Sequence, residues 1–68
     1  MISQAIIDDI ESSYRRPKRI KVNKEILKRI LLDDRCKILT FPETIFIELN
    51  GIPVVIDNDV KQDYKVEY

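Results

Sequence analysis

The stretch TIFIELNGIPVVID, residues 44–57, decides the fold of this 68-residue chain. Asn50-Gly51 separates two apolar runs, and this dipeptide suits a two-residue type I′ turn because both central positions need positive φ. The turn fixes the cross-strand pairs as Leu49–Ile52, Ile47–Val54 and Ile45–Ile56. All three pairs share one face of the hairpin, which we predict to be the core face.

The opposite face of this hairpin is less polar than a solvated face should be. Pro53 stands opposite Glu48 in a position that needs no N–H, and Phe46 stands opposite Val55. Either a helix covers this face as a second core layer, or it is exposed and marks an interface. With Leu32, which projects onto the charged face of a predicted helix, the candidate interface residues are Leu32, Phe46, Pro53 and Val55.

The remaining elements follow from periodicity. Isoleucines at helical spacing predict a helix over 3–14, with Ser3 as N-cap and Pro17 stopping it near Tyr14 or Arg15. Asn23 predicts the cap of a second helix over 24–33. Further strands are expected over the ranges 18–22, 36–41 and 64–68. The chain, residues 1–68, is therefore expected to form a single α+β domain in the order α-β-α-β-β-β-β, with two helices packed on a small, mostly antiparallel sheet.

Residue types argue against catalysis and against bound cofactors. The chain has no histidine, which is the usual general base at neutral pH, and its one glycine is used by the hairpin turn. Cys36 has no imidazole partner and is expected to be a small buried hydrophobe. Asp57, Asp59 and Asp63 do not match a calcium loop, because Lys61 occupies the third ligand position. We expect no enzyme, no metal and no cofactor.

Length and cysteine content bear on location and assembly. A single cysteine fits a reducing compartment, so a cytoplasmic location is expected. No apolar run exceeds three residues, which excludes a membrane span, and residues 1–5 do not resemble a signal peptide. A domain this small, without disulfides or zinc, is marginally stable alone, so we expect a homo-oligomer or docking on a partner.

Charge is sorted along a chain whose net charge is zero. Residues 1–14 carry net −3, residues 15–37 net +7 and residues 38–68 net −4. The candidate basic patch is Arg15, Arg16, Lys18, Arg19, Lys21, Lys24, Lys28 and Arg29. Such a stripe attracts nucleic-acid phosphates, but it also serves to solvate a surface or to meet acidic residues of this chain or of another protein. We favour solvation or charge pairing with protein over nucleic-acid binding.

The second half of the chain, from Phe41-Pro42-Glu43 through Gly51-Ile52-Pro53-Val54-Val55-Ile56-Asp57, resembles the ending of small accessory proteins encoded by tailed phages. These proteins often carry a hairpin of the type G-[IV]-P-[IV]-V-[IV]-D. The resemblance implies a phage or prophage product that binds a host or defence protein stoichiometrically in the bacterial cytoplasm. The sequence thus predicts a non-catalytic, self-associating protein-binding module, with nucleic-acid binding through residues 15–29 as the alternative.

Overall fold

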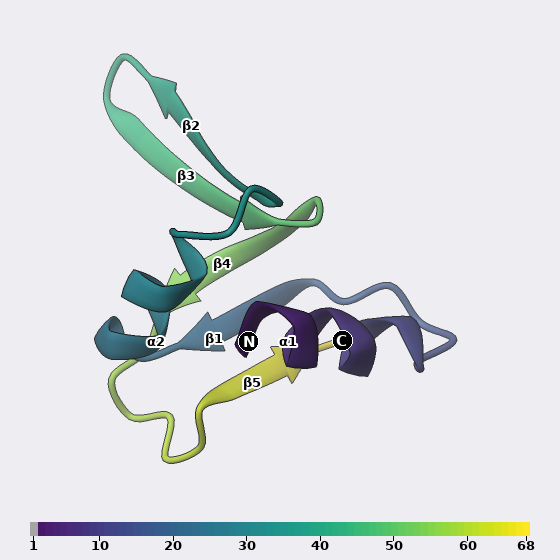
Figure 1. Ribbon diagram of the computed structural model, residues 1–68. Coiled ribbons are helices and arrows are strands. Elements are labelled where there is room, and N and C mark those ends of the chain that lie inside the picture. Colours follow the sequence, from purple (N-terminus) through teal and green to yellow (C-terminus); the bar gives the residue numbers. More distant parts are fainter. Residues whose placement is uncertain (1) are drawn as a thin grey trace.

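Seven elements follow one another in the predicted order in a computed structural model that describes residues 2–68. They are α1 (Ile2–Glu11), β1 (Arg19–Val22), α2 (Lys24–Ile30), β2 (Cys36–Phe41), β3 (Thr44–Leu49), β4 (Ile52–Ile56) and β5 (Tyr64–Glu67). The strands form one sheet in the order β2-β3-β4-β1-β5, as Figure 1 shows. Only the β1–β4 pairing is parallel among these neighbours, so the predicted α+β fold with a mostly antiparallel sheet is confirmed.

The Asn50-Gly51 turn sets the middle of the sheet as predicted. Both residues have positive φ, at 53° and 83°, which is what a type I′ turn requires. The pairs Leu49–Ile52, Glu48–Pro53 and Ile47–Val54 all form. Glycine is needed at position 51 for its backbone conformation, since a Cβ there would meet nothing within 4 Å.

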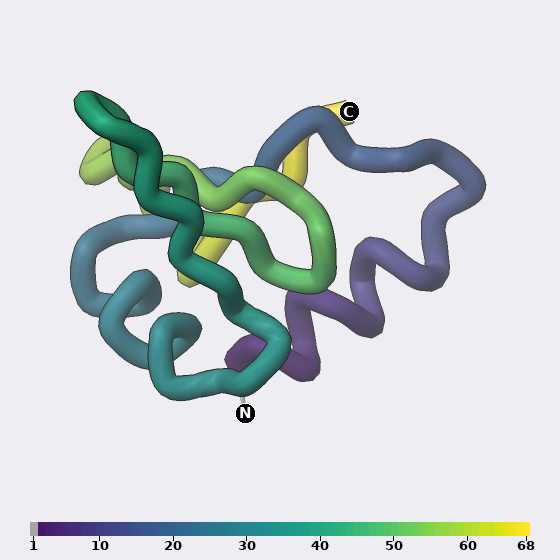
Figure 2. The backbone as a smooth tube through the Cα atoms, turned by 90° about the horizontal axis from the view of Figure 1, so that it is seen from above, coloured from purple at the N-terminus to yellow at the C-terminus, as the bar shows by residue number. Residues whose placement is uncertain are grey.

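Both helices lie on one side of the strands, as the view from above in Figure 2 shows. The alternation of β1 points Ile20 and Val22 toward the helices and leaves Arg19 and Lys21 on the other face. The core between the two layers consists of Ile6, Ile7, Ile20, Val22, Ile26, Leu27, Ile30, Leu49, Ile52 and Val54. This core lies over β4 and β1, and it stops short of the outer parts of β2 and β3.

Three sequence-based expectations about the helices are wrong in detail. Ser3 does not cap α1, because it lies inside the helix and is buried. The helix ends at Glu11, earlier than expected, where the Ser12 hydroxyl donates to the Asp9 carbonyl oxygen at 2.8 Å and competes with the helical ladder. The second helix ends at Ile30 and not at residue 33, although its Asn23 cap is confirmed: the side chain accepts from the Ile26 N–H at 2.9 Å.

The outermost predicted core pair is also wrong. Ile45 and Ile56 are 69% and 51% exposed, because β3 and β4 are paired no further than Ile47–Val54. Beyond that point β4 continues along β1, with Val55 opposite Lys21 and Ile56 opposite Val22, while β3 continues beside β2. The register was right, but the two strands separate before the third pair can form.

Candidate functional site

The separation of β3 from β4 creates a projecting two-stranded ribbon, residues 38–46, which we call the arm. In the arm β2 and β3 pair only with each other, from Leu39–Phe46 to Phe41–Thr44, and Pro42-Glu43 forms the turn at the tip. Figure 1 shows the arm extending away from both helices and from β1 and β5. An isolated two-stranded hairpin is marginally stable in water, so the arm depends on what covers it.

Apolar side chains occupy both faces of the arm. Ile38 and Ile45 lie on the face that continues the core face, and both are exposed. Leu39, Phe41 and Phe46 lie on the other face, where the Phe41 and Phe46 rings meet edge to face with centroids 5.6 Å apart. Glu43 at the tip is the only charged residue between positions 38 and 46. Contiguous exposed apolar patches of this kind are uncommon on monomeric soluble proteins.

An apolar groove opens where β3 and β4 separate. Its volume is about 380 Å³, and it is lined by Ile45, Phe46, Ile47, Pro53, Val54, Val55 and Ile56. Three of the four residues predicted for an interface, Phe46, Pro53 and Val55, line this groove. The fourth, Leu32, is 81% exposed in the turn after α2 and does not line it.

Sequence reasoning missed part of this surface. The hairpin register predicts Ile45 and Ile56 in the core, but both are exposed. Ile38, Leu39 and Phe41 are exposed as well and are not among the predicted interface residues. The sequence does contain a signal for this surface. Residues 38–41 and 44–47 are apolar or uncharged at successive positions, and successive strand residues point to opposite faces, so neither face of that hairpin is charged. Both helices of residues 2–68 contribute to the core on the other face, so neither covers the second face of the arm.

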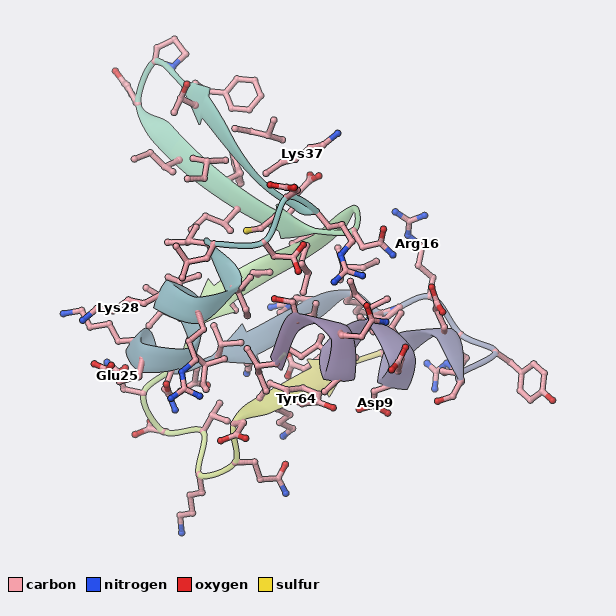
Figure 3. All side chains as sticks on the ribbon, viewed as in Figure 1. Asp9, Arg16, Glu25, Lys28, Lys37 and Tyr64 are labelled. Carbon is pink, nitrogen blue, oxygen red and sulfur yellow. The ribbon has the colours of Figure 1, made fainter. Side chains whose placement is uncertain are left out.

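The eight residues of the candidate basic patch do not share one surface. Arg19 and Lys21 lie on the helix-free face of β1, whereas Lys24, Lys28 and Arg29 belong to α2 on the other side. In Figure 3, Arg16 and Lys28 lie on opposite sides of the molecule as viewed. Lys18 precedes β1, and its backbone N–H donates to the Glu67 carbonyl oxygen at 2.7 Å.

Several of these cations meet acidic residues of the same chain. The Glu67 carboxylate lies 3.3 Å from Arg19 Nε and 3.2 Å from Lys21 Nζ, which is also 3.6 Å from Asp57. Lys28 pairs with Glu25 at 3.5 Å, and the Arg15 guanidinium lies 5.7 Å from the centre of the Tyr68 ring. Part of the basic segment therefore compensates the carboxylates of Asp57 and Glu67, and exposed pairs of this kind add little stability.

Three ionisable side chains, those of Asp33, Arg35 and Cys36, lie beside the base of the arm. Arg35 donates to both carboxylate oxygens of Asp33, at 3.0 and 2.9 Å, and through its backbone N–H at 2.8 Å. The Arg35 side chain lowers the pKa of Asp33 to about 2. Burial, with the Asp33 charge, raises the pKa of the Cys36 thiol, which is half-buried against the core. A thiol with a raised pKa is a poor nucleophile at neutral pH.

Tyr64 joins the C-terminal strand to the first helix. Its hydroxyl donates to Asp9 Oδ2 at 2.9 Å, and Figure 3 shows the two side chains together beneath α1. Burial, followed by this carboxylate, raises the pKa of the Tyr64 phenol. The contact fastens α1 to β5 at the surface of the domain, and it forms no part of the arm.

Comparison of the chain with protein-family models, with curated proteins and with solved structures found no significant match. Across residues 2–68, no helix combines the length and apolarity that crossing a membrane requires. Over the same residues, no three or more acidic or cysteine side chains gather as a metal site would need. The arm and its groove are therefore the candidate functional site.

Proposed function

We propose that this chain is a non-catalytic protein-binding module that docks, and also self-associates, through the arm and its groove. The observation that carries the proposal is the exposure of apolar side chains on both faces of the arm, with Phe41 and Phe46 58% and 50% exposed. Contact surfaces between proteins are enriched in aromatic side chains and depleted of charge at their centre. The arm has both properties, whereas the rest of the sheet's open face carries Arg19, Lys21 and Lys65.

The finer part of the proposal concerns the partner. The likeness of residues 41–57 to endings of tailed-phage accessory proteins supports a phage-encoded modulator or inhibitor of a host or defence protein, acting in the cytoplasm of the bacterial host. Stoichiometric binding suits a chain of this size, because docking supplies the apolar contacts that a 68-residue domain cannot provide for itself.

Affinity capture tests the proposal. The tagged chain is incubated with bacterial lysate, with and without nuclease, alongside Phe46→Glu and the matched control Gln62→Glu. Gln62 is exposed in the connection before β5. We expect a protein that the wild type and the control retain in both conditions and that Phe46→Glu loses, because a carboxylate cannot be desolvated in an apolar groove. Capture that survives Phe46→Glu would remove the arm from the proposal.

The alternative, nucleic-acid binding through residues 15–29, is tested by salt dependence. Replacing Arg15, Arg16, Lys18 and Arg19 by glutamine should flatten the slope of log K against log salt by up to roughly one unit for each phosphate that is no longer neutralised. We expect the wild type to bind duplex and single-stranded nucleic acid more weakly than about a micromolar near physiological salt. Tighter binding would favour the alternative.

A further inference from the structure

β2 is the edge strand of the sheet, and its hydrogen-bonding groups alternate between the two sides. Phe41 and Thr44 flank a two-residue turn, so they form a hydrogen-bonded pair, and the same holds for every second pair along the ladder, Leu39–Phe46 and Lys37–Glu48. The bond from the Asn50 N–H to the Arg35 carbonyl oxygen at 3.1 Å continues this alternation. Ile38 and Thr40 therefore direct their N–H and C=O groups to the open side of β2.

Open edges of this kind accept another strand, and natural proteins usually block them with charges, prolines or bulges. The exposed part of β2, from Ile38 to Phe41, contains none of these. The two strands of the arm also lack a third strand beyond Ile47, because β4 has left β3 there. The geometry thus offers an unprotected template for strand addition at the outer edge.

We propose that β2 pairs antiparallel with β2 of a second copy of this chain, about a two-fold axis at Leu39. This inference rests on the protein-binding role of the arm proposed above, and it names the occupant and the register. A two-fold axis normal to the sheet places the same sheet face of both copies on one side. One residue of β2 must then lie opposite the same residue of the partner, with the axis between them. The candidates in the exposed part of the strand are Ile38, Leu39 and Thr40.

Hydrogen bonding selects among these registers. An axis at Ile38 would set Thr40 against the partner's Cys36, whose N–H already donates to the Asp33 carbonyl oxygen at 3.0 Å. An axis at Thr40 would set Ile38 against the partner's Pro42, which has no N–H. An axis at Leu39 sets Ile38 against the partner's Thr40, and every outward N–H and C=O of both residues then finds a partner.

The side chains fit the same register. Leu39 meets the partner's Leu39 in a close, non-hydrogen-bonded pair, and Lys37 lies opposite the partner's Phe41, next to Glu43 at the tip of the arm. Over residues 2–68, neither Lys37 nor Glu43 belongs to an ion pair within one copy. Antiparallel pairing brings Lys37, at the base of one arm, near Glu43 at the tip of the other. Parallel pairing would instead place the two Lys37 side chains together and the two Glu43 side chains together.

The area sets the strength of the dimer. The apolar side chains of the arm and groove expose on the order of 600 Å² per copy, if each exposed fraction is applied to about 150–200 Å² of side chain. A standard interface buries about 800 Å² per partner, and strand addition covers only part of the available surface. We therefore expect a weak dimer whose population rises with protein concentration, because interfaces below the standard size are typical of transient contacts.

The experiment compares two proline variants by sedimentation velocity over a concentration series from low micromolar to submillimolar. Thr40→Pro removes an outward N–H and leaves the β2–β3 bonds intact, because that N–H is not used in the ladder. Gln62→Pro is the control for introducing a proline: Gln62 is exposed in the connection before β5 and lies outside the arm and its groove. We expect wild type and Gln62→Pro to dimerise and Thr40→Pro to associate at least tenfold more weakly.

A second measurement keeps the inference testable if a proline unfolds the arm. On a Cys36→Ser background, Leu39→Cys should form an intermolecular disulfide at least tenfold faster than Ile38→Cys, because only position 39 lies on the axis within disulfide reach. Faster cross-linking at 38, or a Thr40→Pro dimer as strong as the wild type, overturns the register. A wild type that stays monomeric throughout overturns the dimer and the self-association in the proposed function, whereas capture of a protein partner that Phe46→Glu abolishes would still support its partner-binding part.

Discussion

Ile20 of β1 and Ile45 of β3 are the same side chain on two strands of one sheet, and their surroundings differ completely. Ile20 is fully buried in a core to which both helices contribute, and β4 and β5 flank its strand. Ile45 lies beyond the last β3–β4 pair, where α2, only 7 residues long, does not reach. The covered part of the sheet, which we call the body, holds the domain together, and the arm presents equally apolar residues to the outside.

Truncating an isoleucine side chain should reveal the largest difference in stability between the body and the arm. Ile20→Ala removes buried methylenes and leaves a cavity, so the free energy of unfolding should fall by about 2–5 kcal/mol. Ile45→Ala should change it by no more than about 0.5 kcal/mol, because an exposed side chain has little burial to lose. Urea denaturation at low protein concentration measures both, and equal decreases would mean that the arm is covered within a single copy.

Amide exchange should divide the molecule at the same boundary. At concentrations below self-association, the amides of Leu39 and Phe46 should exchange roughly a hundredfold faster than that of Val54, because the arm opens locally while the body opens only on global unfolding. Hydrogen exchange followed by NMR gives each rate. Uniform protection across β2, β3 and β4 would show that arm and body unfold as one unit.

A cap on α2 should matter to the body alone. Asn23→Ala removes the acceptor for the Ile26 N–H and should cost about 1 kcal/mol of stability. Asn58→Ala, in the exposed turn after β4, is the control and should be neutral. If both variants melt like the wild type, the cap is not needed to hold α2 on the core.

Low pH should reduce the stability of the fold through Asp33, at the junction of body and arm, by less than the substitutions above. The pKa of Asp33 is lowered to about 2 in the folded chain by Arg35, so the ionised carboxylate favours folding. Its contribution is complete above about pH 4, and it is lost as the pH falls from about 4 to 2, because the unfolded chain takes up the proton first. Denaturation at several pH values should show a shallower loss over this window in Asp33→Asn than in wild type or in the control Asp34→Asn.

The hairpin and the second cap were predictable because both are encoded locally. Asn50-Gly51 specifies its own backbone conformation and hence the pairing of the residues next to it, and Asn23 satisfies an N–H three residues away. The first helix was predicted to be too long because Ser12 was treated as part of an amphipathic pattern, while its hydroxyl bonds back to Asp9.

The arm was not predictable from the same information. Turn chemistry fixes which residues of β3 and β4 face each other, and it does not fix how far the two strands remain together. That distance is decided by the parallel pairing of β4 with β1, through Val54 opposite Ile20, a contact between distant parts of the chain. Isoleucine is a typical core residue, and only the three-dimensional arrangement shows that Ile45 and Ile56 line a groove.

The position of β1 in the sheet has a consequence for synthesis. β1 lies between β4 and β5, yet α2, β2 and β3 all separate it in the chain from the nearer of these two neighbours. As the nascent chain leaves the ribosome, Ile20 and Val22 have no strand beside them until most of the protein has emerged, whereas β2, β3 and β4 pair with the segment just made. We therefore expect β2, β3 and β4 to pair early and the body to close late, which leaves the free edge of β2 available to another nascent copy before the domain is complete.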